Sequence, residues 1–232
     1  RLLGLNRYEI VRVLSKKLGE YTPSPSGVYK IIKRNGLNKL KKQMKESKRK
    51  IIKEKAGEMA HIDTHYLSKD LLLSDRKRRY LVAVIDDATR IAWAEVVEDI
   101  TALTVMFSVM RMFNMLMANY NIQFVEVLTD NGPEFGPKIS KNKMNHPFER
   151  MLTEIGVKHR NTKPYRPQTN GKIERFWRTL NEDLIDGTTF ETQEEFKKEL
   201  EEYIWYYNNE RPHQALNGQT PVEFLKKCPR IT

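Results

Sequence analysis

Three carboxylates in this 232-residue chain could together bind divalent cations: Asp63, Asp130 and Glu174. Asp63 falls within an apolar segment, where an ionised side chain is costly unless a partner compensates it. Asp130 follows a short apolar run, and Glu174 lies in the first turn of an expected helix. Carboxylates that a fold brings together repel one another unless cations lie between them, and hard oxygen ligands suit Mg²⁺ or Mn²⁺. The three residues are therefore candidates for a divalent metal site.

Each of these carboxylates also has an ordinary structural explanation. Asp63 could be a satisfied strand residue, Asp130 a turn former, and Glu174 a favourable charge near a helix N-terminus. Only their placement relative to one another can favour the metal site.

Other polar residues compete for the same role. Asp86 and Asp87 are the rival carboxylates, but the surrounding composition is that of a hairpin turn, which favours a structural role. The histidines His61, His65 and His159 could approach the site, yet they show no zinc-ligand spacing. We interpret all five as structural.

The elements that must position the carboxylates follow from hydrophobic periodicity. The first strand contains Asp63, and Asp130 lies at the C-terminal end of another strand, where open α/β sheets tend to place ligand sites. The order β-β-β-α-β-α-β-α predicts a mixed sheet with helices packed on it. Strands are expected at 60–67, 79–85, 91–97, 124–128 and 157–160, and helices at 101–120, 146–155 and 171–184.

Three segments resemble the superfamily of retroviral integrases and bacterial insertion-sequence transposases. They are HIDTH at 61–65, LTDNGPEF at 128–135 and PYRPQTNGKIER at 164–175, and they follow the three signatures of the superfamily in order. The tail YNNERPHQAL at 207–216, with Thr220-Pro221, is similar to its closing segment. The resemblance covers roughly residues 57–225. It implies a ribonuclease-H-like α/β fold with a mixed five-stranded sheet flanked by helices.

The sequence departs from the family pattern in three ways. Between Asp130 and Glu174 lie 43 residues, more than is common in the family, and we place the excess in the polar segment 136–145. Ala60 stands where many relatives carry Trp. The N-terminal His/Cys zinc module of retroviral members is replaced by a helix-turn-helix pattern, which indicates the insertion-sequence branch.

The resemblance implies an enzyme that cuts and joins DNA with two Mg²⁺ or Mn²⁺ ions. Asp63 would bridge both ions, Asp130 would complete one site and Glu174 the other. Water would first cut at the element end and free a 3′-hydroxyl, which would then attack target DNA. Asn131 and Gln168 would position phosphate or the attacking water.

Five cations surround the expected catalytic glutamate. Arg178 follows Glu174 by four residues, so both share one helix face, while the apolar residues between them pack inward. We expect the cations to hold the DNA backbone, although a salt-bridged helix face is the alternative. The five are Lys163, Arg166, Lys172, Arg175 and Arg178.

The positive charge of the chain is concentrated at one end. Residues 1–55 contain 17 Lys and Arg against 4 Asp and Glu, a net of +13, whereas residues 56–232 carry a net of −2. The same end shows two helical patterns separated by a turn, at 8–18 and from Ser24 to Gly36. If the second helix enters the major groove of duplex DNA, Lys30, Lys33 and Arg34 would contact it. A plain helical hairpin is the alternative.

These patterns predict four segments. A helix-turn-helix module at 1–38 precedes a basic linker at 39–56, the catalytic core at 57–190 and a helical extension at 191–232. Cys228 is the single cysteine, which excludes a disulfide framework, and no uninterrupted run of 18 apolar residues occurs. We expect a cytoplasmic protein, nucleoid-associated in a bacterium, that binds element ends and target DNA as a homo-oligomer without a membrane.

Two other functions stay open at this point. The chain could be a DNA-binding regulator or domesticated element with an inactive core, although the presence of all three acids argues against this. It could also be a nuclease for RNA or hybrids, although the basic helix-turn-helix pattern favours duplex DNA.

Overall fold

The computed structural model describes residues 7–37, 52–137, 145–162 and 170–231. The chain divides into two compact units, Arg1–Arg49 and Lys50–Thr232. Each unit is described by itself.

The first unit contains two helices joined by a short 3₁₀ turn, namely α1 (Arg7–Leu18), η1 (Gly19–Tyr21) and α2 (Pro25–Arg34). Ser24 caps α2 by accepting a hydrogen bond from the Gly27 amide at 3.2 Å. Val28 and Ile32 are the buried residues of α2. Gly36 adopts a positive φ of 67° after the helix ends, as a glycine there readily does. The two predicted helices are therefore present, and DNA binding by α2 stays a prediction.

The second unit is built on a mixed five-stranded sheet, which confirms the predicted fold class. The spatial order is β3-β2-β1-β4-β5, with antiparallel pairing among the first three strands and parallel pairing of β1 with β4 and of β4 with β5. The strands are β1 (Ala60–Tyr66), β2 (Tyr80–Asp86), β3 (Ala92–Val97), β4 (Glu126–Thr129) and β5 (Lys158–Asn161).

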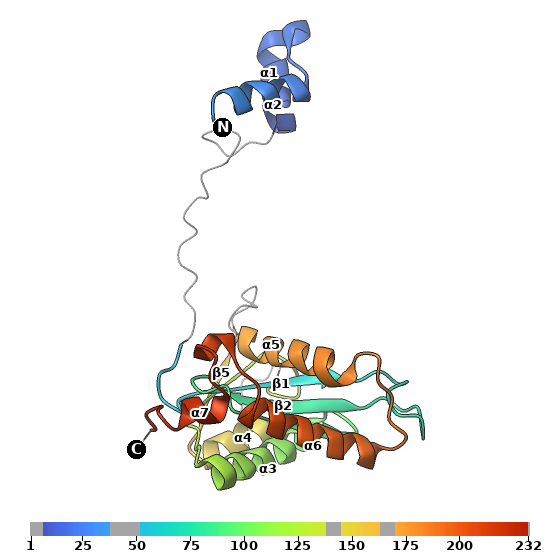
Figure 1. The fold of residues 1–232 in the computed structure, drawn as a ribbon, viewed down its shortest axis with the longest axis vertical. Coiled ribbons are helices and arrows are strands. Elements are labelled where there is room, and N and C mark those ends of the chain that lie inside the picture. Colours follow the sequence, from blue (N-terminus) through green and yellow to red (C-terminus); the bar gives the residue numbers. More distant parts are fainter. Residues whose placement is uncertain (1–6, 38–51, 138–144, 163–169, 232) are drawn as a thin grey trace. The chain divides into compact units, whose positions relative to one another are not determined.

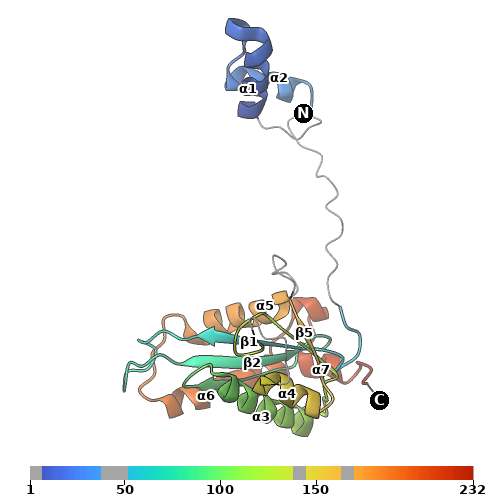
Figure 2. The ribbon, with the colours of Figure 1, turned by 180° about the vertical axis from the view of Figure 1, so that it is seen from behind.

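Helices cover both faces of this sheet (Figures 1 and 2). One face carries α3 (Ala102–Tyr120) and α4 (Pro147–Glu154), and the other carries α5 (Gly171–Leu180) and α6 (Gln193–Asn209). A π-helical turn, η4 (Asn181–Ile185), follows α5, and the chain closes with η5 (Gln214–Leu216) and α7 (Pro221–Leu225).

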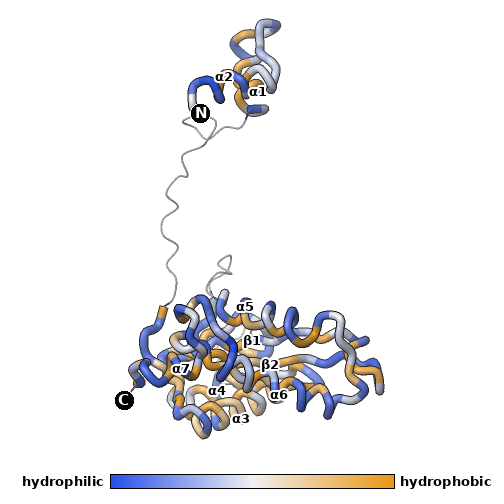
Figure 3. The backbone as a smooth tube through the Cα atoms, viewed as in Figure 1, coloured by the Kyte–Doolittle hydropathy of each residue, from blue (hydrophilic) through white to orange (hydrophobic). Residues whose placement is uncertain are grey.

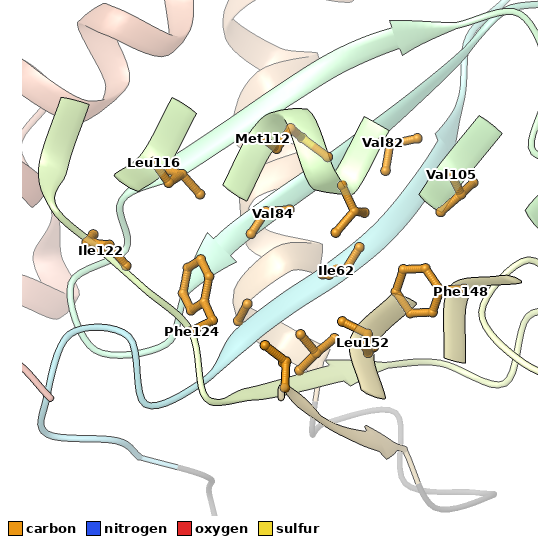
Figure 4. Packing of buried hydrophobic residues seen from close by; sticks show 14 of the residues in the cluster. Ile62, Val82, Val84, Val105, Met112, Leu116, Ile122, Phe124, Phe148 and Leu152 are labelled. Atoms are coloured by element: carbon orange, nitrogen blue, oxygen red, sulfur yellow. The ribbon is translucent and has the colours of Figure 1, made fainter. Parts of the chain in front are cut away.

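The inner strand β2 is buried on both faces, because its alternate residues enter two separate hydrophobic clusters. Val82 and Val84 pack with Ile62 and residues of α3 and α4, as Figure 4 shows for Met112, Leu116, Phe148 and Leu152. The residues that alternate with them along β2 pack against α5 and α6 on the other side; these are Leu81, Ala83 and Ile85. The sheet is therefore a rigid platform for the polar residues of β1.

Helix α3 is long and apolar, and most of it lies on the hydrophobic side of the scale in Figure 3. In the part of the chain that the structure describes, it is the one helix whose length and composition would also suit a membrane span. Its buried side contacts the sheet through Val105, Val109, Met112 and Leu116, which makes it a core helix of this unit.

Some predicted boundaries differ from the observed ones, because contacts between elements also determine where a helix or strand begins and ends. The helix expected at 171–184 ends as an α-helix at Leu180 and continues as the π-helical turn η4, and the strand expected at 124–128 begins at Glu126. Residues 39–51 of the predicted linker and residues 138–144 of the expected polar insertion lie outside the described residues. The end of the linker packs on the core: the Ala56 amide donates to the Pro229 carbonyl at 2.8 Å.

Candidate active site

The centre of the candidate site is Asp63, near the middle of β1. Its neighbour Ile62 belongs to the cluster of α3 and α4, so the alternation of the strand directs Asp63 to the opposite face, which α5 covers. The Trp177 indole Nε1 donates a hydrogen bond to Asp63 Oδ2 at 3.0 Å. The carboxylate is thus held by the helix that carries Glu174.

The Asp63 carboxyl is electrostatically strained in this position. Burial raises its pKa from an ordinary 3.8 to about 6, and repulsion from Asp130 and Glu134 adds to the rise, while the Trp177 hydrogen bond opposes it. A cation beside Asp63 would relieve both the burial penalty and the repulsion. Carboxylate oxygens are the ligands that a hard divalent ion such as Mg²⁺ or Mn²⁺ prefers.

Asp130 is brought to Asp63 by the parallel pairing of β1 with β4. Ala60 faces Val127 and His61 faces Leu128. The same offset of 67 residues places Asp130, one residue beyond the end of β4, opposite Asp63. The register of the sheet explains why two acids far apart in sequence repel each other here.

The turn after β4 is fixed by its own side chains. Asp130 Oδ1 accepts a hydrogen bond from the Gly132 amide at 2.9 Å, and the Asn131 side chain donates to the Thr162 carbonyl at 3.0 Å. Asn131 therefore ties the turn to the chain beyond β5. Phe135 is fully buried and packs edge-on against Phe148, which anchors the far end of the turn in the core.

Glu134 is a fourth carboxylate of the site that the sequence analysis missed. It is buried, and Thr64 Oγ1 on β1 donates to its Oε1 at 3.1 Å. Gly132 allows this arrangement, because an added Cβ would lie within 2.7 Å of the Glu134 carboxylate. The residue stands inside the LTDNGPEF signature, so its place in that motif was the available signal.

Alternate residues of β1 contact α5 along its whole length. His65 also stacks on the Trp177 ring at 5.0 Å. Glu174 is exposed in the first turn of α5, where its carboxylate faces the positive end of the helix dipole. The contacts run in order along both elements: His61 with Asn170, Asp63 with Trp177 and His65 with Asn181.

The three predicted carboxylates are placed on neighbouring elements, but they do not form a closed cluster. Among the described residues, no group of three His, Cys, Asp or Glu side chains lies close enough to hold one metal ion. Asp63 and Asp130 repel each other, and Glu174 lies in the first turn of α5, the helix whose Trp177 binds Asp63. Their joint role as metal ligands stays a prediction.

The predicted DNA-contacting cations differ in their surroundings. Arg175 and Arg178 are exposed on α5, and Lys30, Lys33 and Arg34 are exposed on α2. Lys172 is mostly buried, and its ammonium lies 2.5 Å from an Asp87 carboxylate oxygen. Lys163, Arg166 and Gln168 lie outside the described residues.

The histidines near the site have structural partners. His61 is buried between Asp87 and Asn170, and His159 contacts Thr129 Oγ1 at 2.9 Å and Glu149 at 3.0 Å. Both therefore connect elements of the core, as the sequence analysis interpreted them.

Two family models described as "Integrase core domain" match this chain, at residues 53–167 and 155–221. Together they cover the second unit from the end of the linker to the start of α7. All three predicted carboxylates lie within the matched residues.

Two curated relatives show the same similarity. The protein described as "Putative integrase ORF3" of Spiroplasma virus SpV1-C74 is 30% identical over 200 residues, which are 84% of this chain and 54% of that protein. A transposase InsD of Escherichia coli is 34% identical over 109 residues, 44% of this chain and 32% of that protein. The chain thus spans about half the length of the first relative and a third of the second.

A solved structure agrees with the fold. The HTLV-2 integrase catalytic core domain, solved in complex with magnesium in a trimeric form, has a TM-score of 0.53 and 16% identity, and it covers 76% of this chain and 99% of that chain. This neighbour supports the fold, and the two family models, which together match residues 53–221, show that the chain belongs to the superfamily of integrases and transposases with an integrase core domain.

Proposed function

We propose that this protein is a DNA transposase or integrase that cleaves the 3′ end of a mobile element and joins it to target DNA. The observation that carries the proposal is the partly buried Asp63 carboxylate, held beside Asp130 and attached by Trp177 to the helix of Glu174. This arrangement concentrates negative charge at one end of the sheet. A divalent ion is the partner that such a site favours.

Each carboxylate has a separate task in this proposal. Asp63 and Asp130 would hold one ion, and Asp63 and Glu174 a second. Such ions would supply activation of the attacking oxygen, charge neutralisation at the phosphate and help for the leaving oxygen. Trp177 keeps Asp63 in one orientation, and Asn131 keeps the turn of Asp130 against the chain after β5.

The DNA backbone is held by cations on both units. Arg175 and Arg178 are exposed on α5, the same helix as Glu174, so phosphates bound there lie next to the reacting end. Lys30, Lys33 and Arg34 are exposed on α2, whose apolar residues Val28 and Ile32 are buried. This leaves a basic face of α2 for duplex DNA.

We further propose that the active complex contains more than one copy of the chain and works in the cytoplasm. The trimeric form of the HTLV-2 neighbour supports the first point. Sedimentation of the protein with element-end DNA tests it, since a complex with a single copy would contradict the proposal.

The proposed reaction can be tested with duplex oligonucleotides that carry the element ends and a supercoiled target plasmid. We expect Mg²⁺ or Mn²⁺ to support strand transfer, and Asp63→Asn or Glu174→Gln to reduce it by at least about 1,000-fold. Asp70→Asn, an exposed aspartate after β1, is the matched control and should retain activity. Activity that survives EDTA, or equal activity of Asp63→Asn, would rule out this mechanism.

A further inference from the structure

The turn between β2 and β3 contains a buried carboxylate, Asp87, that the proposed reaction does not use. Its side chain is completely inaccessible to solvent. Such a charge is stable only when it is paired and hydrogen-bonded, so its partners indicate what it holds in place.

Asp87 and its neighbour Asp86 have different partners. Asp86 accepts hydrogen bonds from the Thr89 amide and hydroxyl and from the Gly57 amide, at 2.7 to 2.9 Å, and so closes the hairpin turn. Asp87 instead contacts other elements: its Oδ1 lies 2.6 Å from His61 Nε2 on β1, and its Oδ2 lies 2.5 Å from Lys172 Nζ on α5. Asp87 therefore connects the hairpin with β1 and α5.

Both contacts lead to the N-terminal turn of α5. Lys172 donates a second hydrogen bond to the Asp87 backbone carbonyl at 3.1 Å. His61, on the other side, lies 3.1 Å from Oδ1 of Asn170, the residue at the N-cap of α5. The Asn170 side chain forms no hydrogen bond with the amides of its own helix. The start of α5 is thus tied to Asp87 rather than closed by the usual side-chain cap.

Glu174 stands two residues after Lys172, in the turn that these contacts hold. The opposite end of the same helix is held by Trp177 on Asp63 and by Asn181 with His65. A helix fixed at both ends against β1 keeps a constant spacing between Glu174 and Asp63. Loss of the contacts at the N-terminal end would free Glu174 while Asp63 stays in place.

We propose that Asp87 is a positioning residue which, through Lys172 and through His61 and Asn170, fixes the first turn of α5 and so places Glu174 relative to Asp63. The inference rests on the proposed function for its effect on catalysis, and on the described contacts alone for its effect on α5. It gives Lys172 a structural partner inside the protein in place of the DNA phosphate predicted from the sequence.

Residues that orient metal ligands indirectly typically change metal affinity or activity by about 10–100-fold when they are replaced. We expect Asp87→Asn and Lys172→Met to lower kcat for strand transfer and to raise the Mn²⁺ concentration for half-maximal binding by about that factor, with KM for DNA unchanged. Lys172→Arg, which keeps the cation, should recover most of the activity. Thr89→Ala is the matched control, because it disturbs the same turn without touching α5.

The decisive measurement is hydrogen exchange of the backbone amides of residues 174–177, whose hydrogen bonds close the first turn of α5. We expect these amides to exchange about 10-fold faster in metal-free Asp87→Asn and Lys172→Met, with the amides of β2 unchanged. Thr89→Ala should leave the amides of α5 at the wild-type rate. This test decides the positioning role even if wild-type protein shows no strand transfer.

Three results would overturn the inference. One is unchanged exchange in α5 for both variants, and another is equal acceleration in Thr89→Ala. A third is a Lys172→Met protein that loses affinity for DNA but keeps kcat, since this is the behaviour of a phosphate contact. If Asp87→Asn does not fold, Lys172→Met alone answers the question, because Lys172 retains some exposure to solvent.

Discussion

At the scale of single residues, the position of Asp63 destabilises the metal-free fold and favours the binding of a cation. Asp63 is partly buried beside Asp130 and Glu134, and its pKa of about 6 reflects the cost of keeping it ionised there. A protein that used Asp63 only for packing would gain stability from a neutral residue. The position is costly to the metal-free fold and useful when a cation binds.

This destabilisation predicts the effect of Asp63→Asn on stability. Because the folded pKa lies above the ordinary 3.8, the folded state binds the proton more tightly, and the free energy of unfolding falls as the pH rises from about 4 to about 6. In EDTA at about pH 7.5, the free energy of unfolding of Asp63→Asn should therefore be about 1–3 kcal/mol higher than that of wild type. At pH 4 the two values should differ little. Urea denaturation at the two pH values measures this.

Magnesium provides the control for that prediction. Saturating Mg²⁺ should stabilise wild type and leave Asp63→Asn unchanged, since ligand binding to the folded state alone raises its stability. A variant that is less stable than wild type at pH 7.5 in EDTA would show that Asp63 is not strained.

At the scale of elements, α5 is the part that connects the acids. The indole of Trp177 on this helix both orients Asp63 and stacks on His65. Trp177→Phe keeps the aromatic packing and removes the donor, so it should lower the free energy of unfolding by about 2 kcal/mol at neutral pH and reduce strand transfer. The exposed Trp205 of α6 offers a matched Trp205→Phe control, which should change neither. Equal effects of the two replacements would contradict the role of the indole.

A second contact between elements, of α6 with β3, gives Asn208 of the tail motif YNNERPHQAL a structural role. Asn208 of α6 is buried and pairs with β3, since its side chain accepts from the Ala92 amide at 2.9 Å and donates to the Ala92 carbonyl at 2.8 Å. The amide thereby takes the place of a neighbouring strand at the edge of the sheet.

Asn208→Ala leaves the amide and carbonyl of Ala92 buried without these partners. We expect it to lower the free energy of unfolding by about 2–4 kcal/mol. Asn209 is only half-buried and donates to the Trp205 carbonyl at 2.8 Å, so Asn209→Ala should cost far less. Similar losses in chemical denaturation for the two variants would show that Asn208 does not protect the edge.

The elements themselves were largely predictable from the sequence, whereas the contacts between them were not. Periodicity located the five strands and the helices, because burial on a sheet or helix face leaves a local pattern. The pairing of Asp63 with Trp177, the approach of Glu134 to Thr64 and the role of Asp87 depend on strand register and helix placement. These bring together residues as far as 114 positions apart, so no local pattern records them.

At the scale of the whole molecule, the positive charge is concentrated in the first unit, and the hydrophobic clusters around the sheet lie in the second. Residues 1–49 hold 14 Lys and Arg against 3 Asp and Glu, a net of +11. Both hydrophobic clusters that surround the sheet lie in the second unit, Lys50–Thr232. Residues 52–57 belong with that unit, because Lys53 and Gly57 donate to Asp87 and Asp86.

The division predicts that a protein lacking residues 1–49 folds and binds Mn²⁺ but loses most of its affinity for duplex DNA. For the full chain, affinity should fall by about 1,000-fold or more between 50 and 200 mM salt, as expected for several phosphate contacts. The truncated protein should show a much shallower dependence in fluorescence anisotropy. An unchanged salt slope would place the main DNA contacts in the core.

The most direct test of the account is the binding of Mn²⁺ to the metal-free protein, because it needs neither element ends nor a target. Titration calorimetry should detect Mn²⁺ binding to wild type and to the Asp70→Asn control. We predict that Asp63→Asn, Asp130→Asn and Glu174→Gln each weaken that binding by at least about 10-fold. The same Mn²⁺ affinity in all five proteins would contradict the claim that these three carboxylates form one metal site.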